Sequence, residues 1–293
     1  MRKKLLEKLK SKRAHRVDRI VFTVTFFIFL IYSLSLVYPF IWCFFSSLKE
    51  VSEYFEAPFG LPKEWLFSNY AEALSSLSVN DVSFISMTIN SLWWAFGGTF
   101  ISIFVLSLFS YTVAKYEFKG KNFIQSLNMA LMLLPIMGSM PAAFRLYNQY
   151  GIIDTPLMLL TATGAFGSGF LILQSFFKNL SWSYAEAAYI DGAGDLQIWF
   201  QIMLPMSLPP IFAMALTTFI GRWNDYLTPI IYLEHFPTLS SGLYTYRLIA
   251  VERFGTYPVY FAGVLVAMLP IFILYTAFHK TIMENMLGGG LKE

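Results

Sequence analysis

Long uncharged stretches alternate with shorter polar segments along the 293 residues of this chain. Six stretches contain no Asp, Glu, Lys or Arg, and a helix of about 20 mostly apolar residues is enough to cross the hydrocarbon core of a bilayer. The six stretches are 20–48, 82–114, 122–144, 155–177, 196–221 and 254–279. Because backbone groups in hydrocarbon must find their hydrogen bonds within the segment, the pattern predicts helices.

We therefore expect an all-α membrane protein with six transmembrane helices. Their expected positions are 20–45, 86–113, 123–145, 155–177, 203–229 and 257–280. Composition agrees, because only 13% of the residues are charged, whereas a soluble domain carries about 25%. The apolar stretch that begins at Ile20 is too long for the core of a signal peptide and precedes no small-residue cleavage site, so we interpret it as a retained first helix.

Lysine and arginine are distributed unevenly over the polar segments. Nine of the 21 lie within residues 1–19, and six more lie in connections and a tail expected on the same side of the membrane. Five lie on the opposite side, and Arg222 lies within the fifth expected helix. Since positive residues accumulate on the cytoplasmic side, both termini are predicted to be cytoplasmic. The basic tail could bind nucleic acid, but beside a membrane span attraction to anionic lipid explains it more simply.

The organisation predicted from this pattern is a single membrane domain. Residues 1–19 form a basic cytoplasmic tail, residues 20–282 the transmembrane domain and residues 283–293 a cytoplasmic C-terminal tail. Two polar segments, about 46–82 and 230–256, are expected outside and are interrupted by glycine and proline.

The segment 181–205 differs from its surroundings because it reads as a short amphipathic helix between two spans. Ser183 and Glu186 have the S-x-x-E spacing of a capping box, and Gly192 and Gly194 follow where the helix is expected to end. Asp195 is expected to cap the next helix. Small apolar side chains, those of Ala187, Ala188 and Ile190, suit a helix that enters a cleft on a partner. From spacing alone, a helix lying on the membrane surface remains an equal alternative.

Polar side chains within the fifth expected helix are the second candidate site. Arg222 and Asp225 are three residues apart, so they share a face and could form an ion pair. Charges at membrane depth usually face a cavity or a partner helix, and a structural pair and a path-lining role are equally favoured. Trp223 and Asn224 beside them, together with Asn90, are the remaining candidates for residues that line a substrate path. Trp93 and Trp94 are expected in an interfacial aromatic belt, with pore lining as the alternative.

Several motifs of this chain resemble one family. Glu186-Ala187-Ala188, Asp191-Gly192-Ala193 and Leu204-Pro205 resemble the "EAA" loop of the membrane subunits of ABC importers. Other matching pieces fall in order, among them Tyr38-Pro-Phe-Ile-Trp42, Thr88-Ile-Asn-Ser-Leu92, Gly151-Ile-Ile-Asp-Thr-Pro156, Trp223-Asn-Asp-Tyr226 and Gly288-Gly-Gly-Leu-Lys292. The whole chain is similar to the MalG-type permease subunits of bacterial ABC carbohydrate importers, the binding-protein-dependent transport inner membrane components. Gly138-Ser-Met-Pro141 and Glu293 depart from the family pattern.

The resemblance implies a type I ABC importer permease fold in the bacterial inner membrane, with a coupling (EAA) helix between helices 4 and 5. It implies that the chain is not an enzyme and has no catalytic or metal residues or cofactor of its own. The partner ATPase would bind ATP and Mg²⁺. The partners implied are a homologous MalF-like permease, two MalK-like ATP-binding subunits and an extracytoplasmic sugar-binding protein. The residues implied to couple to the ATPase are Glu186, Ala187, Ala188, Asp191, Gly192, Ala193 and Pro205.

Two other classes of protein share single features with this chain. Gly192-Ala-Gly194-Asp195 is a literal G-x-G-D, which intramembrane aspartyl proteases contain, but the Asp lies in a polar loop and the chain has no Tyr-Asp dipeptide. A stand-alone secondary transporter is disfavoured because six helices are few for one and no span shows paired Gly/Pro interruptions.

Overall fold

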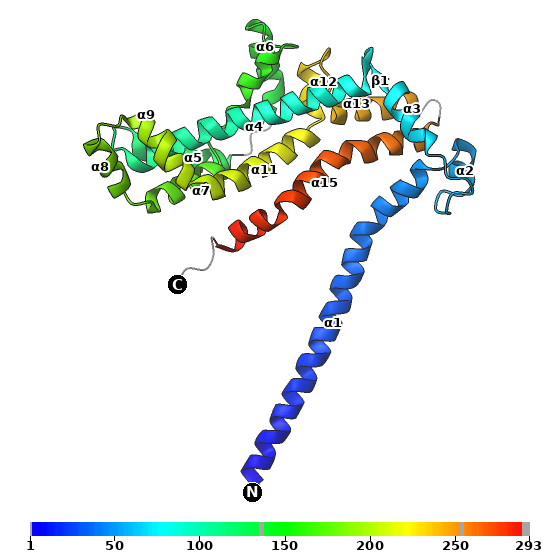
Figure 1. The fold of residues 1–293 in the computed structure, drawn as a ribbon, viewed down its shortest axis with the longest axis horizontal. Helices are drawn as coiled ribbons and strands as arrows, with labels where there is room; N and C mark the ends of the chain where they lie inside the picture. The colour runs from blue at the N-terminus through cyan, green and yellow to red at the C-terminus, as the bar shows by residue number, and fades with distance from the viewer. Residues whose placement is uncertain (1, 135–137, 252–254, 289–293) are drawn as a thin grey trace.

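The computed structural model describes residues 2–134, 138–251 and 255–288, and all the regular secondary structure of that part is helical apart from one short hairpin (Figure 1). The α-helices are α1 (Arg2–Ser47), α2 (Val51–Glu56), α3 (Ser68–Ser76), α4 (Phe84–Lys115), α5 (Lys121–Leu133), α6 (Ser139–Gln149), α7 (Ser168–Asn179), α8 (Ser183–Ile190), α9 (Asp195–Ile198), α10 (Leu204–Met206), α11 (Leu208–Asn224), α12 (Leu227–Tyr232), α13 (Leu239–Tyr246) and α15 (Tyr257–Gly288). The 3₁₀ helix η1 spans Pro156–Ala162, and η2 (Trp199–Met203) and η3 (Arg247–Val251) are π-helical turns.

The hairpin pairs β1 (Ser78–Val79) with β2 (Val82–Ser83) in antiparallel register. Asn80 and Asp81 form its turn with positive φ angles of 50° and 62°, as the tightest hairpin turns require. The external segment predicted over 46–82 therefore contains α2, α3 and this hairpin.

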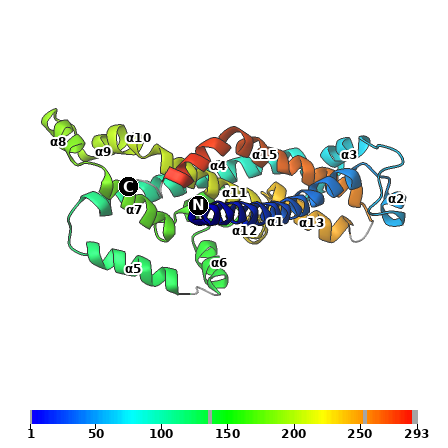
Figure 2. The ribbon, with the colours of Figure 1, turned by 90° about the horizontal axis from the view of Figure 1, so that it is seen from below.

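An elongated body is built around α4, which packs against both α7 and α11, while α15 packs against α11 (Figure 1). The helices α8 and α9 lie at one end of the body, and α2, α3 and the hairpin lie at the other (Figures 1 and 2). The helix α1 diverges from the body and meets α15 only near its C-terminal end, where the rings of Trp42 and Phe261 lie 5.1 Å apart.

Two large apolar cores, one toward each end, stabilise this body, and a smaller cluster of Trp94, Met158, Tyr232 and Leu233 lies among α4, η1 and α12. The core beside α8 joins α4, α7, α8 and the segment before α11, and its buried members include Leu106, Tyr111, Phe170, Phe177, Ala185, Ala188 and Trp199. The core toward α3 joins α3, α4, α11, α13 and α15, and its buried members include Leu77, Phe84, Met87, Phe219, Trp223 and Leu243. Each core ties segments that are far apart in the sequence, so tertiary packing fixes the helices.

Three of the expected spans are single helices. By length and apolar composition, Arg19–Ser47, Phe84–Lys115 and Tyr257–His279 can each cross a membrane. A fourth is possible if Asp195–Met206 and Leu208–Asn224, which meet at an angle of 80°, count as one span. These assignments cover the described residues.

The third and fourth expected spans are not continuous helices, which corrects the prediction. Residues 123–145 divide between α5 and α6, and α5 with 13 residues is only about 20 Å long. Gly138 precedes α6 in the left-handed region, with φ of 77°. Residues 155–177 divide between η1 and α7, and Gly167 before α7 has φ of 115°. The small residues around 163–169 thus separate two helices instead of lying within one.

The fifth expected span, 203–229, is also shorter than predicted. It begins after Ser207, where the backbone bends, and α11 ends at Asn224. Pro205 has no N–H to continue the helical ladder, and the N–H of Leu204 bonds the carbonyl of Trp199 in the wider π pattern. The sequence pattern gave no measure of this bend.

Candidate functional site

The first candidate region is α8 with the segment that follows it. The predicted capping box is absent, because Trp182 and not Ser183 occupies the N-cap position, and its side chain makes no capping bond. Ser183 is the first helical residue, and its N–H donates to the hydroxyl of Ser181 at 3.3 Å. The box cannot form because Ser183 has already entered the helix.

The end of α8 follows the prediction. Gly192 has φ of 83°, a conformation that glycine adopts with little strain. The N–H of Gly192 donates to Tyr189 at 3.0 Å, and the N–H of Ala193 donates to Ala188 at 2.9 Å. This pair of bonds is the Schellman motif, which satisfies the last carbonyls of a helix.

The sides of α8 divide sharply between core and solvent. Ala185 and Ala188 are buried in the core beside α4 and α7, so the prediction that Ala188 belongs to an outer apolar surface is wrong. The helix has to use two alanines to approach that core closely. Glu186, Ala187, Ile190 and Asp191 are exposed, and the Ile190 side chain is 87% accessible. We call these four exposed residues the outer face of α8. Pro205 lies apart in α10 and is exposed, and Ala193 packs against the core.

Asp195 does not cap α9, which corrects a second local prediction. Gly194 is the N-cap residue and Asp195 is the first helical residue. The carboxylate of Asp195 accepts hydrogen bonds from the hydroxyls of Tyr189 and Tyr116, the latter at 2.9 Å. These two donors hold the pKa of the Asp195 carboxyl below its usual value, with Tyr189 the stronger cause. The Asp195 bond in turn raises the pKa of Tyr189.

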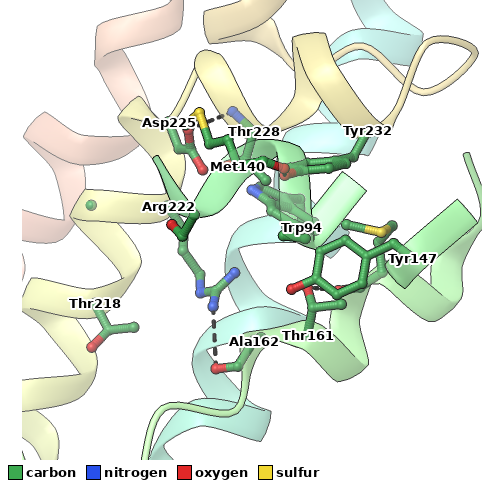
Figure 3. A pocket seen from close by; sticks show the side chains of 14 residues that line it. Trp94, Met140, Tyr147, Thr161, Ala162, Thr218, Arg222, Asp225, Thr228 and Tyr232 are labelled. Carbon is green, nitrogen blue, oxygen red and sulfur yellow. Dashed lines mark hydrogen bonds between the residues drawn. The ribbon is translucent and has the colours of Figure 1, made fainter. Parts of the chain in front are cut away.

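The second candidate region is a cavity of about 690 Å³ at the opposite half of the body (Figure 3). It opens to the surface and is bordered by α4, α6, η1, α11 and α12. The residues that line it are Trp94, Ser139, Met140, Ala143, Tyr147, Met158, Thr161, Ala162, Thr218, Gly221, Arg222, Asp225, Thr228 and Tyr232. Aromatic rings, hydroxyls and two opposite charges therefore face one space.

Arg222 reaches across from α11 toward α4 and η1. Its Nη2 donates to the Ser102 hydroxyl at 3.3 Å and to the Ala162 carbonyl at 3.4 Å. The guanidinium carbon lies 5.4 Å from the centre of the Trp94 ring, within the range of a cation–π interaction. The close approach depends on Gly98, where a Cβ atom would lie 2.6 Å from Nη1.

The predicted ion pair between Arg222 and Asp225 does not form. Asp225 follows the last residue of α11, and its carboxylate accepts the N–H of Thr228 at 3.0 Å. Figure 3 shows the guanidinium turned away from the carboxylate toward Ala162. The helix ends between the two side chains, so the i, i+3 spacing of a continuous helix no longer holds. Each charge instead has its own hydrogen-bond partners.

The other predicted path residues lie outside this cavity. Trp223 is buried, and its Nε1 donates to the Ala267 carbonyl of α15 at 3.1 Å, which makes it a core residue. Asn224 lines a separate cavity of about 280 Å³ with Arg247. The amide of Asn90 donates to the Pro237 carbonyl at 3.0 Å and holds the segment before α13 against α4.

Sequence reasoning missed the residues that α6, η1 and α12 bring to the cavity. Tyr147, Thr161 and Tyr232 lie in segments that were expected to be parts of spans or loops. Tyr232 packs edge-on against Tyr147 with ring centres 5.4 Å apart. Trp94, whose pore-lining alternative was the less favoured one, is buried at the cavity wall. A signal was available in the aromatic and hydroxyl content of 139–161, but not in any spacing.

An ion pair links two loops near the cavity. Asp154 has φ of 58°, and its carboxylate accepts the backbone N–H of His235 at 2.8 Å and contacts the imidazole ring. The contact with Asp154 raises the pKa of His235. The bond draws the turn before η1 toward the segment that follows α12.

Comparison with known proteins identifies the family. The model of the family described as "Binding-protein-dependent transport system inner membrane component" matches residues 104–284. The chain belongs to this family. It is a membrane permease component of an ABC importer, as the sequence motifs indicated.

Relatives align over almost the whole chain. The diacetylchitobiose uptake system permease protein NgcG of Streptomyces coelicolor is 29% identical, and the alignment covers 95% of this chain and 92% of the relative. The arabinooligosaccharides transport system permease protein AraQ of Bacillus subtilis is 27% identical, with 97% and 99% covered. A solved structure described as a bacterial ABC transporter involved in the import of the acidic polysaccharide alginate contains a chain with the same fold. Its TM-score is 0.76 at 24% identity, with 90% of this chain and 97% of that chain covered.

Proposed function

We propose that this chain is a translocation subunit of an ATP-driven importer that moves a sugar or oligosaccharide delivered by an extracytoplasmic binding protein. Family membership and relatives named for oligosaccharide transport support the proposal. The observation that carries it to this chain is the cavity around Arg222, in which aromatic rings, hydroxyls and separated charges converge. Aromatic faces pack against the C–H surfaces of sugar rings, and the charged groups offer hydrogen-bond partners to hydroxyls.

The charges of this cavity favour an uncharged, hydroxyl-rich ligand. Arg222 supplies hydrogen-bond donors. The carboxylate of Asp225 accepts the N–H of Thr228 and has further lone pairs that can accept hydrogen bonds from a ligand. Because the two groups do not pair with each other, a sugar ring can hydrogen-bond to both without first breaking an ion pair. The opposite charges also offset each other, so the lining as a whole does not select strongly for an anion.

In the proposed topology both termini and α8 are cytoplasmic, and 46–82 and 230–256 are external, as the bias in lysine and arginine supports. The six-span arrangement then requires α5 with α6, and η1 with α7, to cross as broken spans. Broken backbone at membrane depth is tolerated where protein partners satisfy it. Asn128 of α5 supplies such partners, because its amide accepts the N–H of Gly167 at 2.6 Å and donates to the same residue's carbonyl at 3.5 Å.

The outer face of α8 would dock an ATP-binding subunit. Its small Ala187 allows a close fit, Ile190 offers an unpartnered apolar contact, and Glu186 and Asp191 offer acidic partners. In this arrangement ATP and Mg²⁺ are bound by two MalK-like subunits, a MalF-like permease completes the path, and the binding protein delivers sugar at the end near α12 and α13. The chain itself would have no cofactor and no nucleic-acid partner.

The test is transport by the complete complex in proteoliposomes with its binding protein. The substrate panel consists of diacetylchitobiose, arabinooligosaccharides and galactooligosaccharides, together with uronate-containing oligosaccharides. We expect ATP-dependent uptake of a neutral member, reduced by Arg222→Ala and by Asp225→Ala, while Asn224→Ala transports normally. Uptake of none of the panel, or unchanged uptake in both cavity variants, would contradict the proposal.

A further inference from the structure

Three polar side chains from different parts of the chain meet near the C-terminal end of α8. Tyr116 directly follows α4, Tyr189 lies in α8 and Asp195 begins α9. The hydroxyls of both tyrosines donate to the same oxygen, Oδ1 of Asp195, and lie 3.4 Å from each other. We call these three residues the tyrosine–aspartate tie. Through these bonds, the tie joins the start of α9 to the residue that follows α4.

A second contact fastens the other end of the same segment. The ammonium group of Lys115, the last residue of α4, donates to the Leu180 carbonyl and lies 5.8 Å from the centre of the Trp182 ring. Tyr116 packs edge-on against Trp182, with ring centres 5.9 Å apart. The stretch from Leu180 to Asp195 is therefore attached to the end of α4 on both sides of α8.

The helix α4 continues from this attachment to the cavity. Its 32 residues correspond to about 48 Å of uninterrupted helix. Near its other end Trp94 packs against the guanidinium of Arg222 and the Gly98 backbone lies against it, and Ser102 accepts a bond from it. One rigid element thus contacts both candidate regions.

The alternative route from α8 through α11 is interrupted. Between Asp195 and Asn224 the chain contains the π-helical turn η2, the short helix α10 and the 80° bend at Ser207. The helical hydrogen-bond ladder does not run continuously through this stretch, because Pro205 has no N–H and the backbone bends at Ser207. A displacement of α8 is therefore carried more directly by α4 than by the segment that follows α8 in sequence.

We propose that Tyr116, Tyr189 and Asp195 are positioning residues that fasten the docking helix α8 to α4, so that α4 carries the movement of α8 to the cavity. The proposal rests on the proposed function, which supplies the ATPase that moves α8. It is a claim about coupling through one physical element, and it assigns the tie no contact with ATP or sugar. The hydrogen bond from Tyr189 lowers the pKa of Asp195 and the bond to Asp195 raises the pKa of Tyr189, the directions expected for a hydroxyl that donates to a carboxylate.

The principal experiment removes the two hydroxyls and keeps the rings. The double variant Tyr116→Phe/Tyr189→Phe is assembled with the second permease and the ATP-binding subunits in proteoliposomes with the binding protein. We expect ATP-binding subunits to co-purify in normal amount and ATP hydrolysis to stay within about twofold of wild type, while sugar moved per ATP falls at least roughly fivefold. Glu117→Gln is the matched control, since Glu117 lies beside the tie and pairs with Lys121 instead; it should keep the wild-type ratio.

The acceptor is tested by a graded pair. Asp195→Asn keeps an oxygen that both hydroxyls can reach and should retain most of the coupling, whereas Asp195→Leu should lose it as the double phenylalanine variant does. If Asp195→Leu and the double variant both move sugar at the wild-type ratio, the proposal is overturned. It is equally overturned if co-purification of the ATP-binding subunits falls in parallel with transport, because the tie would then merely maintain the docking surface.

A second measurement separates this proposal from the proposed function, because it needs no cargo. Spin labels at Ser183 and Lys119, with Cys43→Ala as background, report the separation between α8 and the turn that follows α4, without nucleotide and with ATP bound. We expect the separation in the tied protein to change by less than about 2 Å, the scale of ordinary helix shifts, and to change more in the double variant. Large changes in both would refute the tie even if sugar is transported. Wild-type complexes that move no sugar would refute the proposed function alone.

Discussion

Adding one methyl group at Gly98 should displace the guanidinium of Arg222 from the cavity wall. A Cβ atom at this position would lie 2.6 Å from Nη1 and 2.8 Å from both Cζ and Nε of Arg222, closer than non-bonded atoms approach. The obstructing group is the end of a flexible side chain, so the guanidinium moves and the helix backbone remains. Gly98→Ala therefore tests the placement of a charge without removing it.

The magnitude follows from the contacts that the displaced group gives up. Leaving the Trp94 ring forfeits a cation–π interaction worth about 0.5–2 kcal/mol. The two bonds to Ser102 and Ala162 are long, at 3.3 and 3.4 Å, so they contribute near the lower end of about 0.5–1.5 kcal/mol each. Re-solvation in the cavity recovers part of this sum. A net loss of about 1.4–2 kcal/mol corresponds to a roughly tenfold to thirtyfold lower kcat/KM for transport if the guanidinium contacts the passing sugar.

The assay is the concentration dependence of sugar uptake by reconstituted complexes, with assembly checked by co-purification. Gly97→Ala is the matched control, because its Cβ would lie 2.8 Å from Leu159 Cδ1 and disturbs an apolar contact on the same helix. Equal defects in the two variants would mean that helix packing, and not the guanidinium, is responsible. Normal uptake by Gly98→Ala would refute the inference that Arg222 must occupy this place.

Three further outcomes are expected. Gly192→Ala forces a side chain into φ of 83° and should destabilise the end of α8 by roughly 1 kcal/mol, measurable as faster proteolysis near residue 192, and unchanged cleavage would argue against the strained turn. Asp154→Asn should lower the pKa of His235 toward its ordinary value, because Asp154 raises that pKa. The bond therefore stabilises the folded protein at pH values below the ordinary histidine pKa, and this stabilisation is lost as pH rises through the raised pKa of His235. NMR titration of His235 in both proteins checks the sign. Gly169→Val places atoms against Met214, whose Cε would lie 2.5 Å from the new Cβ, and should lower thermal stability in detergent by roughly 1–3 kcal/mol, whereas an unchanged melting temperature would show that this contact relaxes freely.

The long uninterrupted helices could be predicted from the sequence because local composition decides them. The helices α1, α4 and α15 contain the apolar stretches that begin near residues 20, 82 and 254, and few turn residues interrupt them. The glycine that ends α8 was predictable for a similar reason, since Gly192 alone suffices to place the left-handed residue there. Composition and the EAA-like motif were also sufficient to indicate the family that comparison confirms.

The breaks and the cavity could not be predicted, because contacts between distant segments decide them. The break before α7 depends on Asn128, which bonds Gly167 from another helix. Whether Trp223 lines a path or a core depends on α15, which accepts its N–H. The pairing of Arg222 with Asp225 was predicted from a helix that in fact ends between them. A local pattern records none of these partners.

The separation of α1 from the body has a consequence for the assembly of the subunit. Every side chain from Arg19 to Ile41 is exposed in the single chain. The hydroxyl of Ser35 donates to the Tyr32 carbonyl of the same helix and so does not attach α1 to the body. Lipid covers such a helix without holding it in one orientation, since lipid tails are as apolar as leucine. A chain that has not met its partners thus carries a long apolar helix that is held to the body only near its C-terminal end, so we expect assembly with the partner subunits to fix the orientation of α1.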